Sequence, residues 1–213
     1  VCSESLNFDD ALYLLHERGK AMQEAVPVGQ GSMIAVLGTK NEEIIDLLKL
    51  QNIDKGICEV ANDNANGQII ISGNKNSIEA LQIVLKEKKI KTISLKVSAP
   101  FHCSLMKPAA KIMEKKIYNT NFNNPVFEII NNVTANPEVD PNKIKRLLIE
   151  QIFSTVRWRE SIIKMHENGV KNFIEIGPGK ALAGMIKRTI KDVNCFSINS
   201  ITDIEKFNNE FKK

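Results

Sequence analysis

The order of apolar blocks between residues 33 and 97 limits the folds open to this chain more than any other feature. Short strand-like runs alternate there with two segments whose apolar residues recur at helical spacing. The alternation predicts strands at 33–37, 57–61, 68–72 and 90–97, and helices at 41–50 and 75–88. This β-α-β-β-α-β order is that of the ferredoxin-like split βαβ. Such a small sheet needs a further layer on its open face.

Asn66-Gly67 lies between the two middle strands of this unit. The dipeptide suits a tight turn, either as a two-residue hairpin or as part of a loop that extends back to residue 62. In the second reading Asn62, Asn64 and Gly67 form a polar loop at the end of a strand. A polar loop of this kind is by itself a weak indication of a binding site.

The remaining segments show α/β patterning. Asn7 is positioned to cap a first helix, and a short charged helix or frayed end is predicted at 201–213. Between them the pattern predicts strands at 126–131, 172–176 and 195–198 and helices at 144–153, 158–168 and 181–190. The strands are apolar blocks, as in a parallel sheet covered on both faces. Two or three strands cannot make such a sheet alone, so we expect partner strands in sequence that precedes Val1.

Composition excludes several classes of function. The 213 residues are 43% apolar, which is enough for a folded core. The net charge of +4 comes from 29 basic residues spread among 25 acidic ones, a balance that gives no sign of a nucleic-acid partner. Four separated cysteines indicate neither a disulfide framework nor a metal site, and no apolar run of about 18 residues indicates a membrane span. We expect a cytoplasmic protein with no cofactor and no membrane partner.

His102 is the strongest candidate for chemistry. It follows Ser98-Ala99-Pro100-Phe101 at a strand-to-helix junction, where Pro100 and Phe101 restrict the turn. A general base must be held at a fixed angle, and this setting suits one, although a histidine that merely caps or fills remains the alternative. The adjacent Cys103 is a poor nucleophile for it because neighbouring side chains diverge. His16 and His166 are predicted on helix surfaces by their spacing.

Two further polar side chains fall on apolar helix faces. Arg18 shares a face with Ala11, Leu14, Leu15 and Met22, so it must extend out of the core, form an ion pair, or meet an anion in a cleft. Gln151 continues an apolar stripe of the helix predicted at 144–153 and directs an uncharged amide inward. That amide is either a structural hydrogen-bonding group or a positioner of a catalytic one.

Gly177-Pro178-Gly179-Lys180 follows a predicted strand and opens a helix. The segment resembles a phosphate-binding turn but lacks the Walker spacing and the hydroxyl residue after lysine. A tight structural turn is therefore the favoured reading, and backbone amides that approach a substrate are the alternative.

Several separate segments, taken in order, resemble malonyl-CoA:acyl carrier protein transacylases, and the resemblance covers essentially the whole chain. The segments are 31–38, 61–64, 67–73, 97–102, 151–158 and Glu175-Ile176-Gly177-Pro178-Gly179-Lys180. The resemblance implies an α/β-hydrolase-like acyltransferase domain at 1–32 and 98–213, incomplete here. It also implies a ferredoxin-like subdomain inserted at 33–97, in agreement with the apolar pattern.

The same resemblance implies residue roles in fatty-acid biosynthesis, with malonyl-CoA and acyl carrier protein as partners. His102 matches the histidine that activates a serine, and Arg18 matches the arginine that pairs with the malonyl carboxylate. Gln151 matches a glutamine whose backbone carbonyl orients the histidine, and Asn62 is expected to contact substrate. Cys103 stands where the family usually has serine, which would make the site sensitive to oxidation if the thiol were exposed.

One part of that mechanism is missing. No Gly-x-Ser-x-Gly elbow occurs in the 213 residues, so the nucleophile is not on this chain. We therefore expect the C-terminal portion of a transacylase, shortened at its N-terminus and inactive alone. One alternative is a non-catalytic binder of carrier protein or acyl-CoA, against which an uncovered half-sheet argues. Another is a polyketide-synthase acyltransferase domain, which the absence of linker-like ends disfavours.

Overall fold

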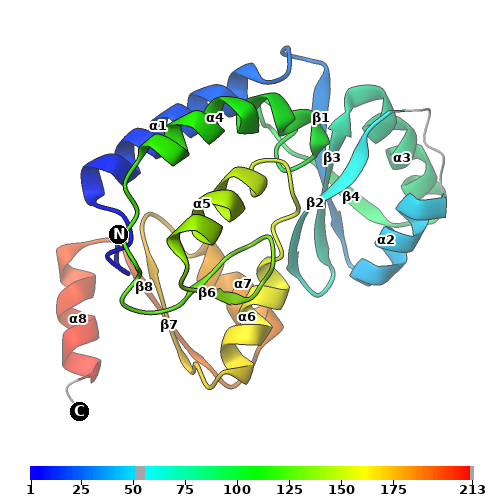
Figure 1. The fold of residues 1–213 in the computed structure, drawn as a ribbon. Helices are drawn as coiled ribbons and strands as arrows, with labels where there is room; N and C mark the ends of the chain where they lie inside the picture. The colour runs from blue at the N-terminus through cyan, green and yellow to red at the C-terminus, as the bar shows by residue number, and fades with distance from the viewer. Residues whose placement is uncertain (51–55, 212–213) are drawn as a thin grey trace.

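The computed structural model describes residues 1–50 and 56–211, and its elements alternate between helices and strands (Figure 1). In chain order they are α1 (Phe8–Glu24), β1 (Gly31–Leu37), α2 (Asn41–Leu50), β2 (Cys58–Ala65), β3 (Gln68–Asn74), α3 (Lys75–Glu87), β4 (Lys91–Ser94), the 3₁₀ turn η1 (Ser104–Met106), α4 (Lys107–Asn119), β5 (Ile129–Ile130), β6 (Pro137–Glu138), α5 (Pro141–Glu150), α6 (Trp158–Glu167), β7 (Asn172–Ile176), α7 (Ala181–Thr189), β8 (Asn194–Ile198) and α8 (Ile201–Phe211). The chain is therefore mixed α/β, as its sequence predicts. β2 begins at Cys58, one residue later than predicted. Residues 212–213 of the predicted C-terminal helix lie outside the described residues.

A four-stranded antiparallel sheet forms in the order β2-β3-β1-β4. β2 continues to Ala65, so residues 62–65 belong to a strand and not to a loop, and Asn66-Gly67 alone makes the turn to β3. Gly67 has φ +72°, a conformation that favours glycine. β4 is shorter than predicted because it pairs with β1 only from Lys91 to Ser94.

The two faces of this sheet pack against different partners because side chains alternate along each strand. Ile34 and Val36 of β1 face a cluster built with α2 and α3. Met33 and Ala35 face the other way and pack with Phe101. The second layer that the small sheet requires is therefore the segment that leads directly into His102.

α1 and α4 lie side by side along one edge of the molecule (Figure 1). The Asn7 side chain accepts a hydrogen bond from the Asp10 amide at 2.7 Å, which confirms the predicted helix cap. Leu14 and Met22 are buried between the helices. Leu15 is 63% exposed, but it lines one pocket with Ala11, Leu14 and Arg18, so these residues share a face as predicted. Leu15 lies at the open edge of that face, one residue on from the buried Leu14.

β7 and β8 pair in parallel from Asn172↔Asn194 to Ile176↔Ile198, as the apolar blocks predict. The strand predicted at 126–131 does not join them. Only Ile129–Ile130 is extended with a partner, β6, and that pairing is antiparallel. The amide of Val126 donates instead to the Ser3 carbonyl at 2.9 Å, so this segment is held by the N-terminal residues of the chain.

Candidate active site

The His102 turn has an unusual backbone. His102 has φ +57°, in the left-handed region, which costs a non-glycine residue about 1–2 kcal/mol. Contacts from the neighbouring sheet hold it there. Pro100 packs so closely on Gly31 that a Cβ atom at Gly31 would lie 2.3 Å from Pro100 Cγ. The Cys103 thiol donates to the Pro100 carbonyl at 3.1 Å and closes the turn on itself.

The imidazole of His102 bonds to the backbone of Gln151, with 3.0 Å between Nδ1 and the carbonyl oxygen. A carbonyl can only accept, so Nδ1 carries the proton and Nε2 keeps its lone pair. Burial lowers the pKa of His102 most strongly, the Gln151 hydrogen bond raises it, and the charge of Arg18 lowers it further. The ring is therefore held neutral, with the basic nitrogen fixed.

Arg18 is partly buried, and burial lowers its pKa. It lines a pocket of about 280 Å³ whose other walls are Gln151 and six apolar residues. Within residues 1–50 and 56–211, no carboxylate forms an ion pair with Arg18. Of the three alternatives set by the sequence, the structural ion pair is therefore absent from the described residues.

Gln151 contributes its backbone and not its amide. α5 ends at Glu150, so Gln151 is the residue that terminates the helix, with a side chain that is only partly buried. Its side chain makes no hydrogen bond to any residue in the described ranges. Of the two roles considered for the amide, neither is supported by a hydrogen bond within the described residues. The backbone carbonyl reaches the histidine instead, as the family resemblance implies.

Asn62 lies within β2, where it pairs with Ile70 and bridges to Val156. Its side chain has no hydrogen-bond partner among the residues that the structure describes, and none joins it to His102 or Arg18. The structure thus brings His102, Gln151 and Arg18 together and leaves Asn62 on the adjoining strand.

A family model described as the acyl transferase domain matches residues 1–210. The chain belongs to this acyl transferase family. It is 40% identical over 209 residues to the malonyl CoA-acyl carrier protein transacylase of Haemophilus influenzae, which covers 98% of this chain and 66% of that relative. The resemblance drawn from the sequence motifs is confirmed.

Solved structures agree. The malonyl CoA-acyl carrier protein transacylase of Clostridium perfringens superposes with a TM-score of 0.93 at 37% identity, over 99% of this chain and 66% of that one. A malonyl-transacylase solved in complex with a type II PKS acyl-carrier protein gives a TM-score of 0.92 at 34% identity, over 98% of this chain and 68% of that one. The chain spans just under two thirds of the length of the first relatives that it matches.

The glycine-rich turn of this acyl transferase is structural. The Gly179 amide donates to the Asn199 side chain at 2.7 Å. The Glu175 carboxylate accepts from the amides of Leu182 and Ala183 at 3.1 and 2.9 Å, and so caps the first turn of α7. Because a carboxylate already occupies the start of that helix, a phosphate would meet repulsion there.

One prediction about a reactive side chain needs correction, and one condition set for another is not met. His166 is not fully on the surface, since it is partly buried and its Nδ1 has no hydrogen-bond partner among the residues that the structure describes, whereas His16 is exposed as predicted. The Cys103 thiol is completely buried, and burial raises its pKa. The exposure on which oxidation sensitivity depends is therefore missing from the acyl transferase.

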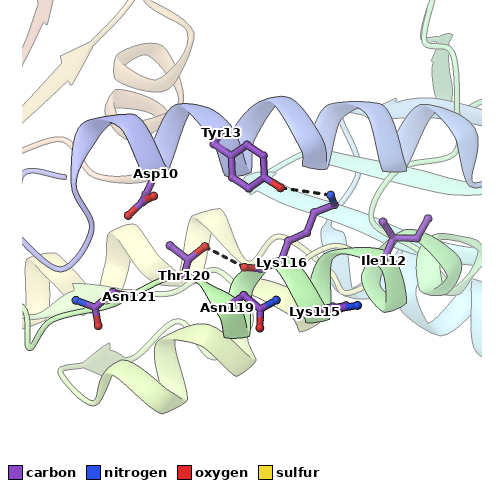
Figure 2. A pocket seen from close by; sticks show the side chains of 8 residues that line it. All are labelled: Asp10, Tyr13, Ile112, Lys115, Lys116, Asn119, Thr120 and Asn121. Atoms are coloured by element: carbon purple, nitrogen blue, oxygen red, sulfur yellow. Dashed lines mark hydrogen bonds between the residues drawn. The ribbon is translucent and has the colours of Figure 1, made fainter.

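A separate polar groove of about 690 Å³ runs between α1 and α4 (Figure 2). Tyr13 of α1 points at Lys116 of α4, with 3.4 Å between the hydroxyl and Nζ, and Glu17 pairs with the same lysine at 2.8 Å. None of the four predicted site residues lines this groove. It therefore lies apart from the site of the acyl transferase.

The charged residues of β2 were not predicted as part of any site. Glu59 accepts two hydrogen bonds from Ser104, and Asp63 forms a bidentate pair with Arg159 of α6. Carboxylates that alternate with the apolar positions of a predicted strand are the signal that could have found them, because buried charges need partners. In the described part of the acyl transferase no group of three or more potential ligands could hold a metal ion, and no helix is long and apolar enough to cross a membrane.

Proposed function

We propose that these residues belong to an enzyme that moves malonyl from coenzyme A to acyl carrier protein through a serine ester. The observation that carries the proposal is the Arg18 guanidinium, which lines an apolar pocket without a carboxylate partner in the described chain, beside the His102–Gln151 pair. The names of the relatives support the substrate and the carrier protein.

Arg18 would bind the free carboxylate of the malonyl group. A guanidinium offers two parallel N–H donors that match a carboxylate, and a partly buried charge gains most from an ionic partner. An acetyl group has no carboxylate and would leave the charge of Arg18 unpaired in the pocket. Discrimination between the two thioesters then follows from the cost of that unpaired charge.

His102 would act as the general base. Its Nε2 removes the proton of the serine hydroxyl as the oxygen attacks the thioester carbonyl, and the coenzyme A thiolate leaves with that proton. In the second half the carrier-protein thiol gives its proton to Nε2 as its sulfur attacks the ester carbonyl, and the serine oxygen leaves with that proton. The Gln151 carbonyl keeps Nδ1 protonated throughout and stabilises the transient positive charge on the ring.

The serine itself would come from polypeptide outside these 213 residues, because no Gly-x-Ser-x-Gly occurs within them. The chain by itself would then lack the covalent step. Asn62 belongs to the proposal as a substrate-binding residue, supported by a side chain that no described residue engages. The cytoplasmic location remains a prediction.

The proposed architecture is an α/β-hydrolase-like domain at 1–32 and 98–213 with a ferredoxin-like subdomain inserted at 33–97. The strand order β2-β3-β1-β4, with one helix after β1 and another after β3, supports the subdomain. The parallel β7–β8 pair supports the larger domain, since Ile174 and Ile176 of β7 are 45% and 73% exposed and offer an apolar face to further structure.

The test compares malonyl-CoA with acetyl-CoA, using the chain extended by a segment that carries the serine elbow. Arg18→Ala is expected to lower kcat/KM for malonyl-CoA about 10- to 150-fold, the range for a hydrogen bond to a charged group, and to leave acetyl transfer no slower. Lys116→Ala, in the separate groove, is the matched cation control and should leave the ratio unchanged. Equal losses for both thioesters in Arg18→Ala would contradict the proposed role.

The 213-residue chain alone provides the second arm. Incubated with malonyl-CoA and examined by intact mass spectrometry, it is expected to gain no malonyl group, since it has no elbow serine. A stable malonyl adduct on this chain would overturn the assignment of the nucleophile to outside residues.

A further inference from the structure

We propose that Glu59 of β2 is a positioning residue for His102: its carboxylate holds the turn in the conformation that keeps Nδ1 on the Gln151 carbonyl. The inference rests on the proposed role of His102 as the base. It adds a second residue of β2, besides Asn62, to a site whose other members lie outside the four-stranded sheet.

Glu59 binds the residue that starts η1, two positions after His102. One carboxylate oxygen accepts from the Ser104 amide at 2.8 Å and the other accepts from the Ser104 hydroxyl at 2.7 Å. Both groups are partly buried, and a hydrogen bond to an ionised acceptor is roughly twice as strong as a neutral one. Two bonds from one carboxylate also fix the direction of the chain as it leaves the turn.

The other contacts between the sheet and the turn are weaker. The Ser72 hydroxyl lies 3.6 Å from the Cys103 sulfur, which is a poor acceptor, and Gly31 meets Pro100 by packing alone. Within the described chain, Glu59 is the one charged group that hydrogen-bonds to residues 100–104. Its two hydrogen bonds are therefore the largest contribution from the sheet to offset the free-energy cost of the left-handed backbone at His102.

The same strand also holds the segment that follows Gln151. The Thr155 hydroxyl donates to the Val60 carbonyl at 2.6 Å, and the Val156 amide donates to the Ala61 carbonyl at 2.8 Å. Residue 59 fixes the histidine turn and residues 60–61 fix the glutamine segment. β2 thus sets the separation of the two groups that share the 3.0 Å hydrogen bond.

The position of the turn decides which tautomer of His102 is present. A free imidazole prefers the proton on Nε2, and the basic nitrogen of that tautomer is Nδ1, which faces Gln151 and not the position proposed for the serine. Only the Gln151 carbonyl, held in reach of Nδ1, reverses the preference. Loss of Glu59 should let the turn relax from its strained backbone and return the ring to a mixture of tautomers.

The experiment reads the tautomer directly by NMR of the 213-residue chain with ¹⁵N-labelled histidine, above the histidine pKa. His102 is assigned by the signals that disappear in His102→Asn. The unsubstituted chain should show a protonated Nδ1 and an unprotonated Nε2. In Glu59→Ala the two nitrogen shifts should move toward each other. Glu59→Gln should restore the original pattern, since its amide oxygen accepts from the Ser104 amide and its NH₂ group donates to the hydroxyl.

Ile44→Val is the control for stability, because it removes one buried methylene from α2, far along the chain from the turn. It should leave both nitrogen shifts unchanged. A folded Glu59→Ala chain with unchanged shifts would overturn the proposal. If Glu59→Ala does not fold, Ser104→Ala decides: converging shifts support the proposal, and unchanged shifts overturn it. Failure of malonyl transfer would sink the proposed function without altering these spectra.

Discussion

Nδ1 of His102 lies 3.0 Å from the carbonyl oxygen of Gln151, 49 positions further along the chain. The bond fixes which ring nitrogen carries the proton, and therefore which one is free to act as a base. A backbone carbonyl does this without adding a charge. The histidine thus stays neutral in a buried site that also contains the Arg18 cation.

The pH dependence of stability should reveal His102. Its folded pKa lies below its ordinary value of about 6.5 because burial disfavours the charged ring. The unfolded chain therefore binds the proton more tightly, so the contribution to stability is complete above about pH 6.5 and is lost as the pH falls through the folded pKa. The free energy of unfolding, measured in urea at about pH 7.5 and pH 5.5, should fall less between the two pH values in His102→Gln than in the unsubstituted chain. Equal losses would contradict the lowered pKa.

Gly31→Ala should destabilise the chain by about 1–3 kcal/mol, as overpacking does. The added Cβ would lie 2.3 and 2.4 Å from two carbons of the Pro100 ring, so the turn before His102 must shift. Gly184→Ala in α7 is the control, because nothing lies within 4 Å of its added Cβ. That change should stabilise by about 0.5–1 kcal/mol through helix propensity. Denaturant unfolding of both variants measures the difference, and a neutral Gly31→Ala would refute the close contact.

Asp63→Ala should cost about 3–5 kcal/mol of unfolding free energy. The Asp63 carboxylate accepts from Arg159 at 2.8–3.0 Å and from the Asn41 amide at 2.6 Å. Its removal leaves the poorly exposed Arg159 with only the longer 3.4 Å pair to the exposed Glu42. The exposed Asp46, which pairs with Lys49 on the surface, provides the control. Asp46→Ala should change stability by less than about 0.5 kcal/mol, and a comparable effect from both would contradict a buried network.

Cysteine labelling should proceed in an order set by burial. The thiolate is the reactive species, and burial raises the pKa of Cys103 and raises that of Cys58 to about 12. Cys2 is exposed and should react first with iodoacetamide, whereas Cys103 should react only when the chain unfolds. Peptide mass spectrometry over a time course gives the order. Early modification of Cys103 would show that the His102 turn opens in the native state.

The helices and most strands follow from local pattern. Asn7 caps α1 as predicted, and β7 begins and ends at the predicted residues, because capping and apolar periodicity act over a few neighbouring positions. The prediction of a strand at 126–131 was wrong because it used only such local patterns. Its apolar residues suit a strand, but the hydrogen bond from Val126 goes to Ser3, a partner that no local pattern can identify.

The sequence by itself determined that the chain is α/β, that His102 lies on a restricted turn, and, through the family resemblance, which residues to examine. Tertiary structure alone decided that Cys103 is sealed from solvent and that Glu59 binds the turn at Ser104, and it gave the 3.0 Å distance for the Gln151 carbonyl that the resemblance had implied. These facts depend on distances between segments far apart in the chain. Periodicity determines which way a side chain faces, but only the packing of whole elements brings two such faces to within 3 Å.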